Sequence, residues 1–316
     1  MAKAFVGQEY QVATRGQGLE QTSRGVRIAT RVTVTMSVSL MVCSVMVILL
    51  CLLFYLSPIN GTSMMVAINA TGLNTDQAVV CRVQSPQRGE IFITKLYLED
   101  TNQCYYDNNG NIILTDYIKN HFNMTDSRGR YTNIIKRLIA VGGDQITMTR
   151  TPNQNLDLDF DRNYDYTIYV NGEALVEDYL DPQIGSRNSV NMIRLWRILN
   201  GLNPDLSSWK HTDYFAVVSV IDDVPTLTVP EGFIFFMGDN RDGFELRDPN
   251  TGTLVIDPTT NEPVPTGPSW DSTALGPLPA ADIVGVAYDI IPRDTNMIAY
   301  VFNQIWYYIS FAWAWQ

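Results

Sequence analysis

Histidine and cysteine are both scarce in this chain of 316 residues, which carries two histidines and four cysteines. Cysteines and histidines this scattered offer none of the spacings that hold a zinc ion or an iron–sulfur cluster. The sequence therefore predicts no metal site and no cofactor. The scarcity also limits catalysis, because a nucleophilic serine needs a neighbouring base, and lysine becomes a serious candidate for that base.

Basic residues are also few, with 22 Lys and Arg against 33 Asp and Glu, for a formal net charge of −11. A nucleic-acid surface needs clustered basic side chains, so nucleic acid is excluded as a partner. The G-x-S-x-G elbow of lipases is absent. Aspartates alternate between 157 and 165 without the EF-hand spacing, so a solvated turn is favoured there over a calcium site.

Charge disappears altogether from Val32 to Leu56, a run that also lacks proline and glycine. At about 1.5 Å per residue, a helix of this length exceeds the roughly 30 Å of a hydrocarbon core. The run is too long for the apolar centre of a signal peptide, and a poor cleavage site follows it. Residues 32–56 are therefore expected to be a transmembrane anchor in the lipid bilayer.

The charge on either side of this run is uneven. Residues 1–31 carry five basic and two acidic side chains, whereas the rest of the chain carries 17 basic and 31 acidic ones. Basic flanks stay on the cytoplasmic side of a membrane. We therefore expect residues 1–31 in the cytoplasm, a single pass through the cell membrane, and an extracytoplasmic domain over residues 57–296.

Beyond the anchor, short apolar runs alternate with turn residues, a pattern typical of strands. The expected strands are 78–83, 90–94, 166–170, 215–220, 233–237 and 283–288. Asn171-Gly172 and Asn109-Gly110 favour hairpin turns, and residues 190–199 fit one short helix. The predicted fold class is mainly β, with insertions at about 98–132, 150–165 and 243–267 that resemble loops or lids.

Two features of the exported part stay open. The tail, residues 297–316, has no charged side chain and eight aromatic ones. It is expected to lie at the membrane interface, with a second crossing as the alternative. Cys81 and Cys104 could form a disulfide in an oxidising compartment, but the sequence does not show that they meet.

Two residues stand out for their chemistry. Ser63 follows the anchor in Ile-Asn-Gly-Thr-Ser-Met-Met, and Lys136 lies in Ile-Ile-Lys-Arg-Leu-Ile-Ala-Val-Gly-Gly-Asp. Apolar neighbours can lower the pKa of a lysine and leave it neutral as a base. Taken singly, Ser63 fits an ordinary turn and Lys136 a solvated strand lysine, so spacing alone does not decide between these interpretations.

The order of the segments is similar to that of bacterial type I signal peptidases, also called leader peptidases, which are membrane proteases of the Ser/Lys type. Gly61-Thr62-Ser63-Met64-Met65 resembles their nucleophile box, and residues 134–144 resemble their general-base box. Phe236-Met237-Gly238-Asp239-Asn240-Arg241-Asp242 is the most specific match. The last box resumes after an insertion at Ser269-Trp270-Asp271-Ser272, and the agreement covers roughly residues 32–292.

This resemblance implies a serine endopeptidase that removes signal peptides from exported preproteins and works with the secretion machinery. Ser63 would be the nucleophile and Lys136 the general base. Ser269 would orient the lysine amine, Asp271 would support that loop, and the main chain near Gly61 would help to bind the oxyanion. The family cleaves after small residues, and its shallow pockets correspond to Ile59, Met64, Ile134 and Ile135.

Two of the departures from the family pattern concern residues beside the expected site. Val66 replaces the usual proline after the Ser-Met-x triplet, and Thr273 replaces the arginine of Asp-Ser-Arg, for which Arg241 or Arg247 could substitute. Three alternatives remain: a non-catalytic anchored surface or binding protein, a relative that has lost activity, and a self-cleaving protein like the SOS repressors. The last lacks support, because the chain has no DNA-binding domain.

Overall fold

The computed structural model of the chain divides into two compact units, Met1–Phe54 and Tyr55–Gln316. It describes residues 3–59, 63–64, 68, 76–101, 113, 115–152, 163–180, 189–202, 209–211, 214–241, 270–292, 295–296 and 300. Side chains are described from residue 26 onward, apart from those of Tyr117, Tyr214 and Phe215.

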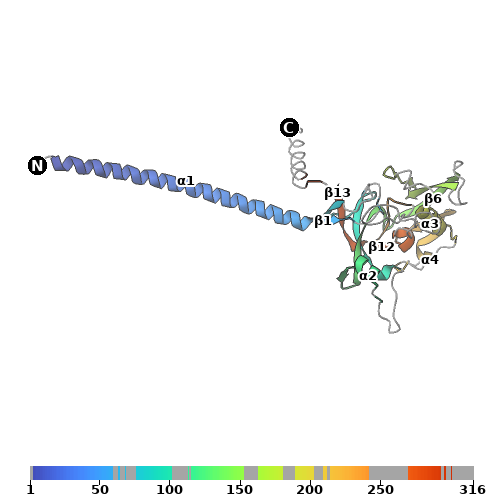
Figure 1. Cartoon of the computed structure of the whole chain (residues 1–316). Helices are drawn as coiled ribbons and strands as arrows, with labels where there is room; N and C mark the ends of the chain where they lie inside the picture. The colour runs from blue at the N-terminus through green and yellow to red at the C-terminus, as the bar shows by residue number, and fades with distance from the viewer. Residues whose placement is uncertain are drawn as a thin grey trace. The chain divides into compact units, whose positions relative to one another are not determined.

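The first unit is essentially one long helix, α1 (Lys3–Leu53), drawn in blue in Figure 1. Its stretch Val26–Leu53 has a mean hydropathy of 2.7, and the most apolar part of this stretch is 0% buried within the protein. By length and composition it is the one helix among the described residues that could cross a membrane. The expected anchor ended at Leu56, but the helix stops three residues earlier, because Phe54–Pro58 forms strand β1.

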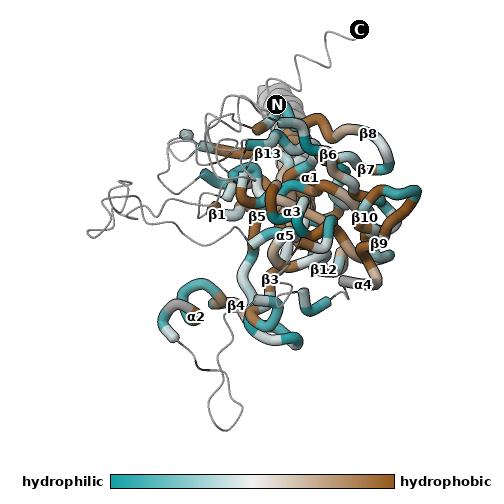
Figure 2. The backbone as a smooth tube through the Cα atoms, turned by 90° about the vertical axis from the view of Figure 1, so that its right-hand side faces the viewer, coloured by the Kyte–Doolittle hydropathy of each residue, from teal (hydrophilic) through white to brown (hydrophobic). Residues whose placement is uncertain are grey.

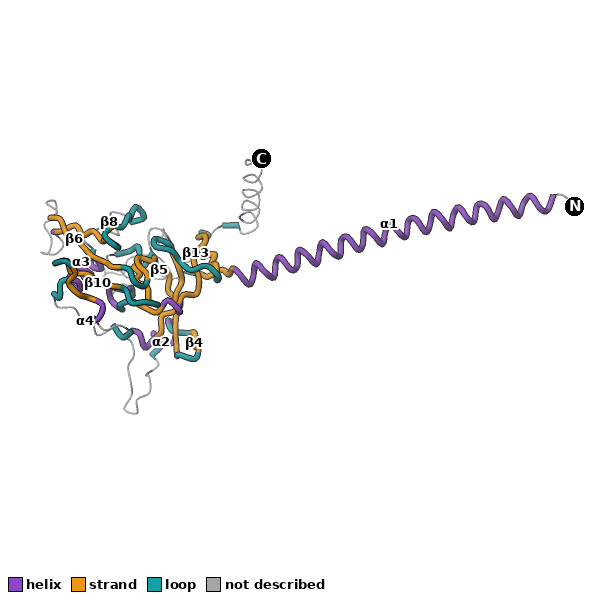
Figure 3. Tube along the Cα trace, turned by 180° about the vertical axis from the view of Figure 1, so that it is seen from behind, coloured by secondary structure: helices purple, strands orange, loops and turns teal. Residues whose placement is uncertain are grey.

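The second unit is mainly β, as predicted, and contains two sheets, whose strands are orange in Figure 3. The larger sheet has eight strands in the order β1-β2-β13-β3-β5-β11-β12, with β4 paired to β5. Its other strands are β2 (Gln77–Cys81), β3 (Ile91–Tyr97), β4 (Met124–Asp126), β5 (Gly129–Val141), β11 (Phe233–Met237), β12 (Leu278–Pro279) and β13 (Ile283–Ile291).

The smaller sheet has five strands in the order β8-β7-β6-β10-β9. They are β6 (Gln145–Pro152), β7 (Tyr164–Val170), β8 (Glu173–Ala174), β9 (Val218–Ile221) and β10 (Val224–Thr228). Figure 2 shows hydrophobic stretches, in brown, along strands such as β10. The Asn171-Gly172 hairpin is confirmed, since both residues have positive φ and join β7 to β8.

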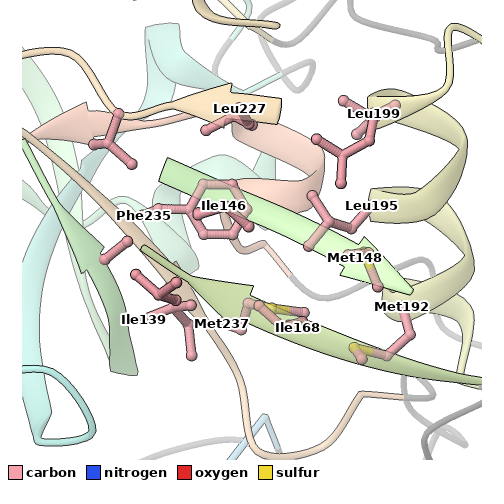
Figure 4. Packing of buried hydrophobic residues seen from close by; sticks show 14 of the residues in the cluster. Ile139, Ile146, Met148, Ile168, Met192, Leu195, Leu199, Leu227, Phe235 and Met237 are labelled. Atoms are coloured by element: carbon pink, nitrogen blue, oxygen red, sulfur yellow. The ribbon is translucent and has the colours of Figure 1, made fainter. Parts of the chain in front are cut away.

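Short helices complete the fold: η1 (Leu98–Asp100), α2 (Asp116–His121), α3 (Val190–Leu199), α4 (Tyr214–Val217), α5 (Ser272–Leu275) and η3 (Ala280–Asp282). The predicted helix at residues 190–199 is confirmed with the same bounds. Its buried side chains Met192, Leu195 and Leu199 point toward strand residues such as Ile146 and Ile168, as Figure 4 shows. This packing fixes α3 against the sheets.

Part of the segment expected as a loop at 98–132 is regular structure, so that prediction was wrong there. Ile118 and Phe122 of the α2 segment are buried in a core cluster with Phe92 and Leu138, and Thr115 caps the helix by accepting from Ile118 N. The polar composition of the segment concealed these two apolar anchors. The expected strand at 215–220 also begins late, because α4 occupies its first residues.

Several other expectations fall outside the described residues. These are the Asn109-Gly110 turn, residues 153–162 of the 150–165 insertion, the 243–267 insertion and the tail beyond Tyr300. Cys81 is a buried free thiol, and Cys104 lies outside the described residues.

Candidate functional site

Ser63 lies in a turn that follows β1 and is held to a distant segment. Its carbonyl oxygen accepts a hydrogen bond of 3.0 Å from the backbone N–H of Asn240, just after β11. Next to it, the buried Met64 side chain packs in a cluster with Ile59, Ile68 and Ile135. The serine is half-buried, and the hydrogen bond from Asn240 holds its backbone in place.

Lys136 lies in the middle of β5, opposite Phe92 of β3. Side chains alternate along a strand, so Lys136 shares a face with Ile134 and Leu138. Both of these pack against the cluster that contains Phe92, Phe236 and Leu275. As a result, Lys136 is only 3% exposed, which is rare for a lysine.

This environment changes the charge state of the amine. Burial lowers the pKa of Lys136 to about 8, while the negative charges of Asp271 and Asp239 act in the opposite direction. Near neutral pH an amine with this pKa is neutral in about a tenth of the molecules. A group of this kind can both accept and return a proton under physiological conditions.

The next residue, Arg137, ties β5 to the segment after β11. Its guanidinium binds both carboxylate oxygens of Asp239 at 2.8 and 2.6 Å and also donates to the Gly89 carbonyl at 2.6 Å. Its charge lies 3.8 Å above the Tyr179 ring. This bidentate pair fixes the position of Asp239 relative to the strand that carries Lys136.

Asp271 is fully buried beside α5 and is bound by neutral donors. Its Oδ1 accepts from Thr273 N at 3.0 Å and from Thr273 Oγ1 at 2.6 Å, and its Oδ2 accepts from Asn191 Nδ2 at 2.7 Å. Burial raises the pKa of the Asp271 carboxyl, opposed by the Thr273 hydrogen bonds and by the charge of Lys136.

The arginine expected to pair with Asp271 is replaced by this set of donors. Arg241 is fully buried, but its guanidinium binds Glu177 at 2.6 Å and the Gly238 carbonyl at 2.6 Å. It reaches Asp271 only through a weak long-range charge effect. Arg247 lies outside the described residues. Thr273, at the position of the family's arginine, makes the closest contact with Asp271.

The structure brings some of the predicted site residues together and separates others. Ile59, Met64 and Ile135 share one cluster, whereas Ile134 packs against another. Among the described residues, the Ser63 hydroxyl and the Lys136 amine form no hydrogen bond with each other. Ser269 and Gly61 lie outside the described residues, so their roles stay predictions.

Asn191 is a site residue that the sequence analysis missed. It lies on the buried face of α3 with Met192, Leu195, Ile198 and Leu199. A polar residue in the apolar stripe of an amphipathic helix is a signal that could have identified it, because buried polar groups must find partners.

One side of β5 lacks a strand partner near Lys136. β3 pairs with β5 from Tyr131 to Arg137. On the other side, β4 pairs only up to Tyr131, and β11 begins at Arg137. Among the described strands, residues 132–136 therefore have an open edge on that side.

Comparisons with known proteins identify the family of this chain. Residues 32–243 match the protein family described as signal peptidase, peptidase S26. A solved structure, signal peptidase I from Enterococcus faecalis V583, is 19% identical with a TM-score of 0.26, covering 65% of this chain and 97% of that chain. No curated protein matches the chain. Because the family match spans more than half of the sequence, this chain belongs to the signal peptidase family, peptidase S26.

Proposed function

We propose that the chain cleaves signal peptides from exported preproteins with Ser63 as nucleophile and Lys136 as general base. Membership of the signal peptidase family implies a serine peptidase that acts on signal peptides. The observation that carries the finer assignment is the buried Lys136, whose pKa is lowered to about 8. A lysine on an exposed strand would stay protonated and could not accept the serine proton.

The proposed reaction proceeds through an acyl-enzyme. Ser63 Oγ attacks the scissile carbonyl while its proton moves to Lys136 Nζ. The tetrahedral oxyanion accepts from the Ser63 backbone N–H and from the main chain near Gly61. Lys136 then gives its proton to the leaving amine, and the peptide C–N bond breaks. Water, activated by the neutral lysine, hydrolyses the ester and restores Ser63.

The hydroxyl and the amine need to meet only when substrate is bound. Catalytic hydrogen bonds are often long in a free enzyme and tighten in the substrate complex. The Asn240 to Ser63 hydrogen bond already holds the nucleophile's backbone beside the segment that contains Asp239. A bound peptide would also exclude water and lower the pKa of Lys136 further.

The open edge of β5 supports an extended substrate. A peptide added alongside residues 132–136 would complete the ladder with main-chain hydrogen bonds. Such a strand would end next to Lys136. Ile59, Met64 and Ile135, which share one cluster, would limit the space for alternate substrate side chains and favour small ones. Ile134 faces the other cluster and would act on the opposite face.

The test is cleavage of a preprotein with a small-x-small motif by the full chain in detergent, with N-terminal sequencing of the product. Ser63→Ala and Lys136→Ala should each abolish cleavage. Ser219→Ala on exposed β9 and Lys119→Ala on the exposed face of α2 are matched controls that should retain it. Cleavage by either dyad variant would refute the assignment. An inactive but folded parent chain would favour a relative that has lost activity.

A further inference from the structure

Asn191, in the first turn of α3, connects two segments that surround Lys136. Its backbone N–H donates to the Arg241 carbonyl at 3.1 Å, and its side-chain Nδ2 donates to Asp271 Oδ2 at 2.7 Å. The side chain is 0% exposed.

The segment that Asn191 holds on one side leads directly to the nucleophile. Arg241 follows Asn240, whose N–H donates to the Ser63 carbonyl. The Arg241 guanidinium in turn donates to Met192 Sδ at 3.3 Å, so the first turn of α3 contacts this residue twice. α3 is itself anchored in the core through Leu195 and Leu199, and is therefore a rigid support for both contacts.

We infer that Asn191 is a positioning residue that holds the Asp271 carboxylate and the 238–241 segment in register around Lys136. This inference rests on the proposed function. In place of the family's arginine, the neutral amide of Asn191, from a different element, binds the Asp271 carboxylate. A neutral donor stabilises the carboxylate without adding a positive charge that would compete with the lysine ammonium.

The charged groups around Asn191 and Asp271 determine the direction in which the pKa of Lys136 should change. Lys136 is faced by Asp271 and Asp239, and Asp239 is paired with Arg137. Arg241 acts weakly on Asp271 and is itself surrounded by Glu177, Tyr179 and Asp239. Loss of the Asn191 donor destabilises the Asp271 carboxylate and favours its protonated form. With less negative charge nearby, Lys136 becomes neutral at a lower pH.

The experiment compares Asn191→Leu, which keeps the size of the side chain, with the parent chain in detergent. We expect kcat to fall about tenfold or more, and the rising limb of the kcat/KM profile to move down by about half a pH unit. Asn191→Asp puts a second carboxyl group in hydrogen-bond range of Asp271. Two carboxyl groups this close share one proton, so the pair keeps a hydrogen bond and a single negative charge, and its limb should stay at the parent position. A downward shift in Asn191→Leu that Asn191→Asp does not share would not follow from a general loss of packing.

Asn200→Leu is the matched control, because Asn200 ends the same helix and its Nδ2 donates only to the Trp196 carbonyl, at 2.9 Å, among the side-chain contacts seen. It should keep the parent pH profile. A folded Asn191→Leu chain with the parent profile and rate would overturn the inference. If that variant unfolds, Asn191→Val, which also lacks the donor, takes its place, and an unmoved limb in that variant also overturns the inference.

The parallel dyad variants separate this result from the proposed function. Retained cleavage by Ser63→Ala or Lys136→Ala contradicts the dyad itself. Loss of cleavage in both, together with an unchanged rate and pH profile in Asn191→Leu, contradicts the role of Asn191 alone.

Discussion

Lys136 combines two properties that rarely coexist: a burial close to complete and an ionisable amine. The strands around Lys136 exclude water from its amine, and the negative charges of Asp271 and Asp239 only partly offset the lost hydration of the ammonium. The charged form of Lys136 would therefore be more stable in solvent than in this buried position. Both the reactivity and the stability of the protein should depend on it.

The first prediction concerns pH. Only the neutral amine can accept the Ser63 proton, so kcat/KM should rise with pH and level off above an apparent pKa of about 8. Below that pH the rate should fall about tenfold per unit. Initial rates of preprotein cleavage in detergent from pH 6 to about 10 measure this limb. A flat profile across this range would exclude Lys136 as the base.

The second prediction concerns stability. The pKa of Lys136 falls from 10.5 to about 8 on folding, so the unfolded chain binds the extra proton between these values. The burial penalty is therefore complete below pH 8, on the order of 3 kcal/mol, and disappears as the pH rises toward the unfolded pKa. Lys136→Met should abolish cleavage and yet raise the free energy of unfolding at pH 7.

Denaturant unfolding in detergent, followed by tryptophan fluorescence, measures that change. The gain should shrink as the pH is raised from 8 to about 10. Lys119→Met, at an exposed position of α2, is the control and should show neither effect. A destabilised Lys136→Met chain would mean that the amine has a favourable partner in the folded state.

At the scale of elements, the site depends on how β5 is tied to the segment after β11. The Arg137–Asp239 pair is bidentate and almost fully buried. Removal of one partner from such a pair leaves an isolated buried charge, whereas removal of both leaves none.

The third prediction follows from this asymmetry. Arg137→Met and Asp239→Leu should each lower the free energy of unfolding by about 3–5 kcal/mol, while the two substitutions together should lose less than the sum. A double-mutant cycle from denaturant unfolding measures the coupling. Additive effects would show that the two side chains do not stabilise each other.

The elements also show how far sequence alone could predict this structure. Strands such as β3, β7 and β11 were predictable because their apolar residues are consecutive or alternate locally. α2 was missed because Ile118 and Phe122 form its apolar face within a polar segment. The Asn191–Asp271 contact joins residues 80 positions apart, and no local pattern encodes which distant carboxylate a buried amide will meet.

The candidate site could likewise be predicted from the sequence only in part. Ser63 and Lys136 could be proposed from their segments, because each lies in a recognisable string of residues. The donors to Asp271 could not, since Thr273 looks like the loss of an arginine until its hydroxyl is seen on the carboxylate.

At the scale of the whole molecule, the apolar part of α1 would set the location of the unit Tyr55–Gln316. Signal peptidases of this family are membrane-associated, and Val26–Leu53 is long and apolar enough to cross a bilayer. The five basic residues of the first 31 favour a cytoplasmic N-terminus. Ser63 comes soon after α1 in the sequence. Preproteins would therefore meet it near the membrane surface from which they emerge.

The fourth prediction is therefore topological. The full chain should remain in the membrane pellet after alkaline carbonate extraction, because Val26–Leu53 is long and apolar enough to cross the bilayer. Protease added to the extracytoplasmic side should digest the unit Tyr55–Gln316 and protect a short N-terminal fragment. A tag at the N-terminus reports the protected fragment. Release of the full chain by carbonate would contradict the anchor.

The edge of β5 that no described strand covers would, in the proposed reaction, limit which polypeptides can be cut at all. An edge of this kind offers amide and carbonyl groups only to a chain whose own groups are free and point sideways. A helical segment keeps those groups for itself, and a folded domain hides them in its own sheets. Selection would thus begin with backbone shape, before any side chain is tested. A mature domain that has already folded would escape cleavage even where its sequence contains a suitable motif.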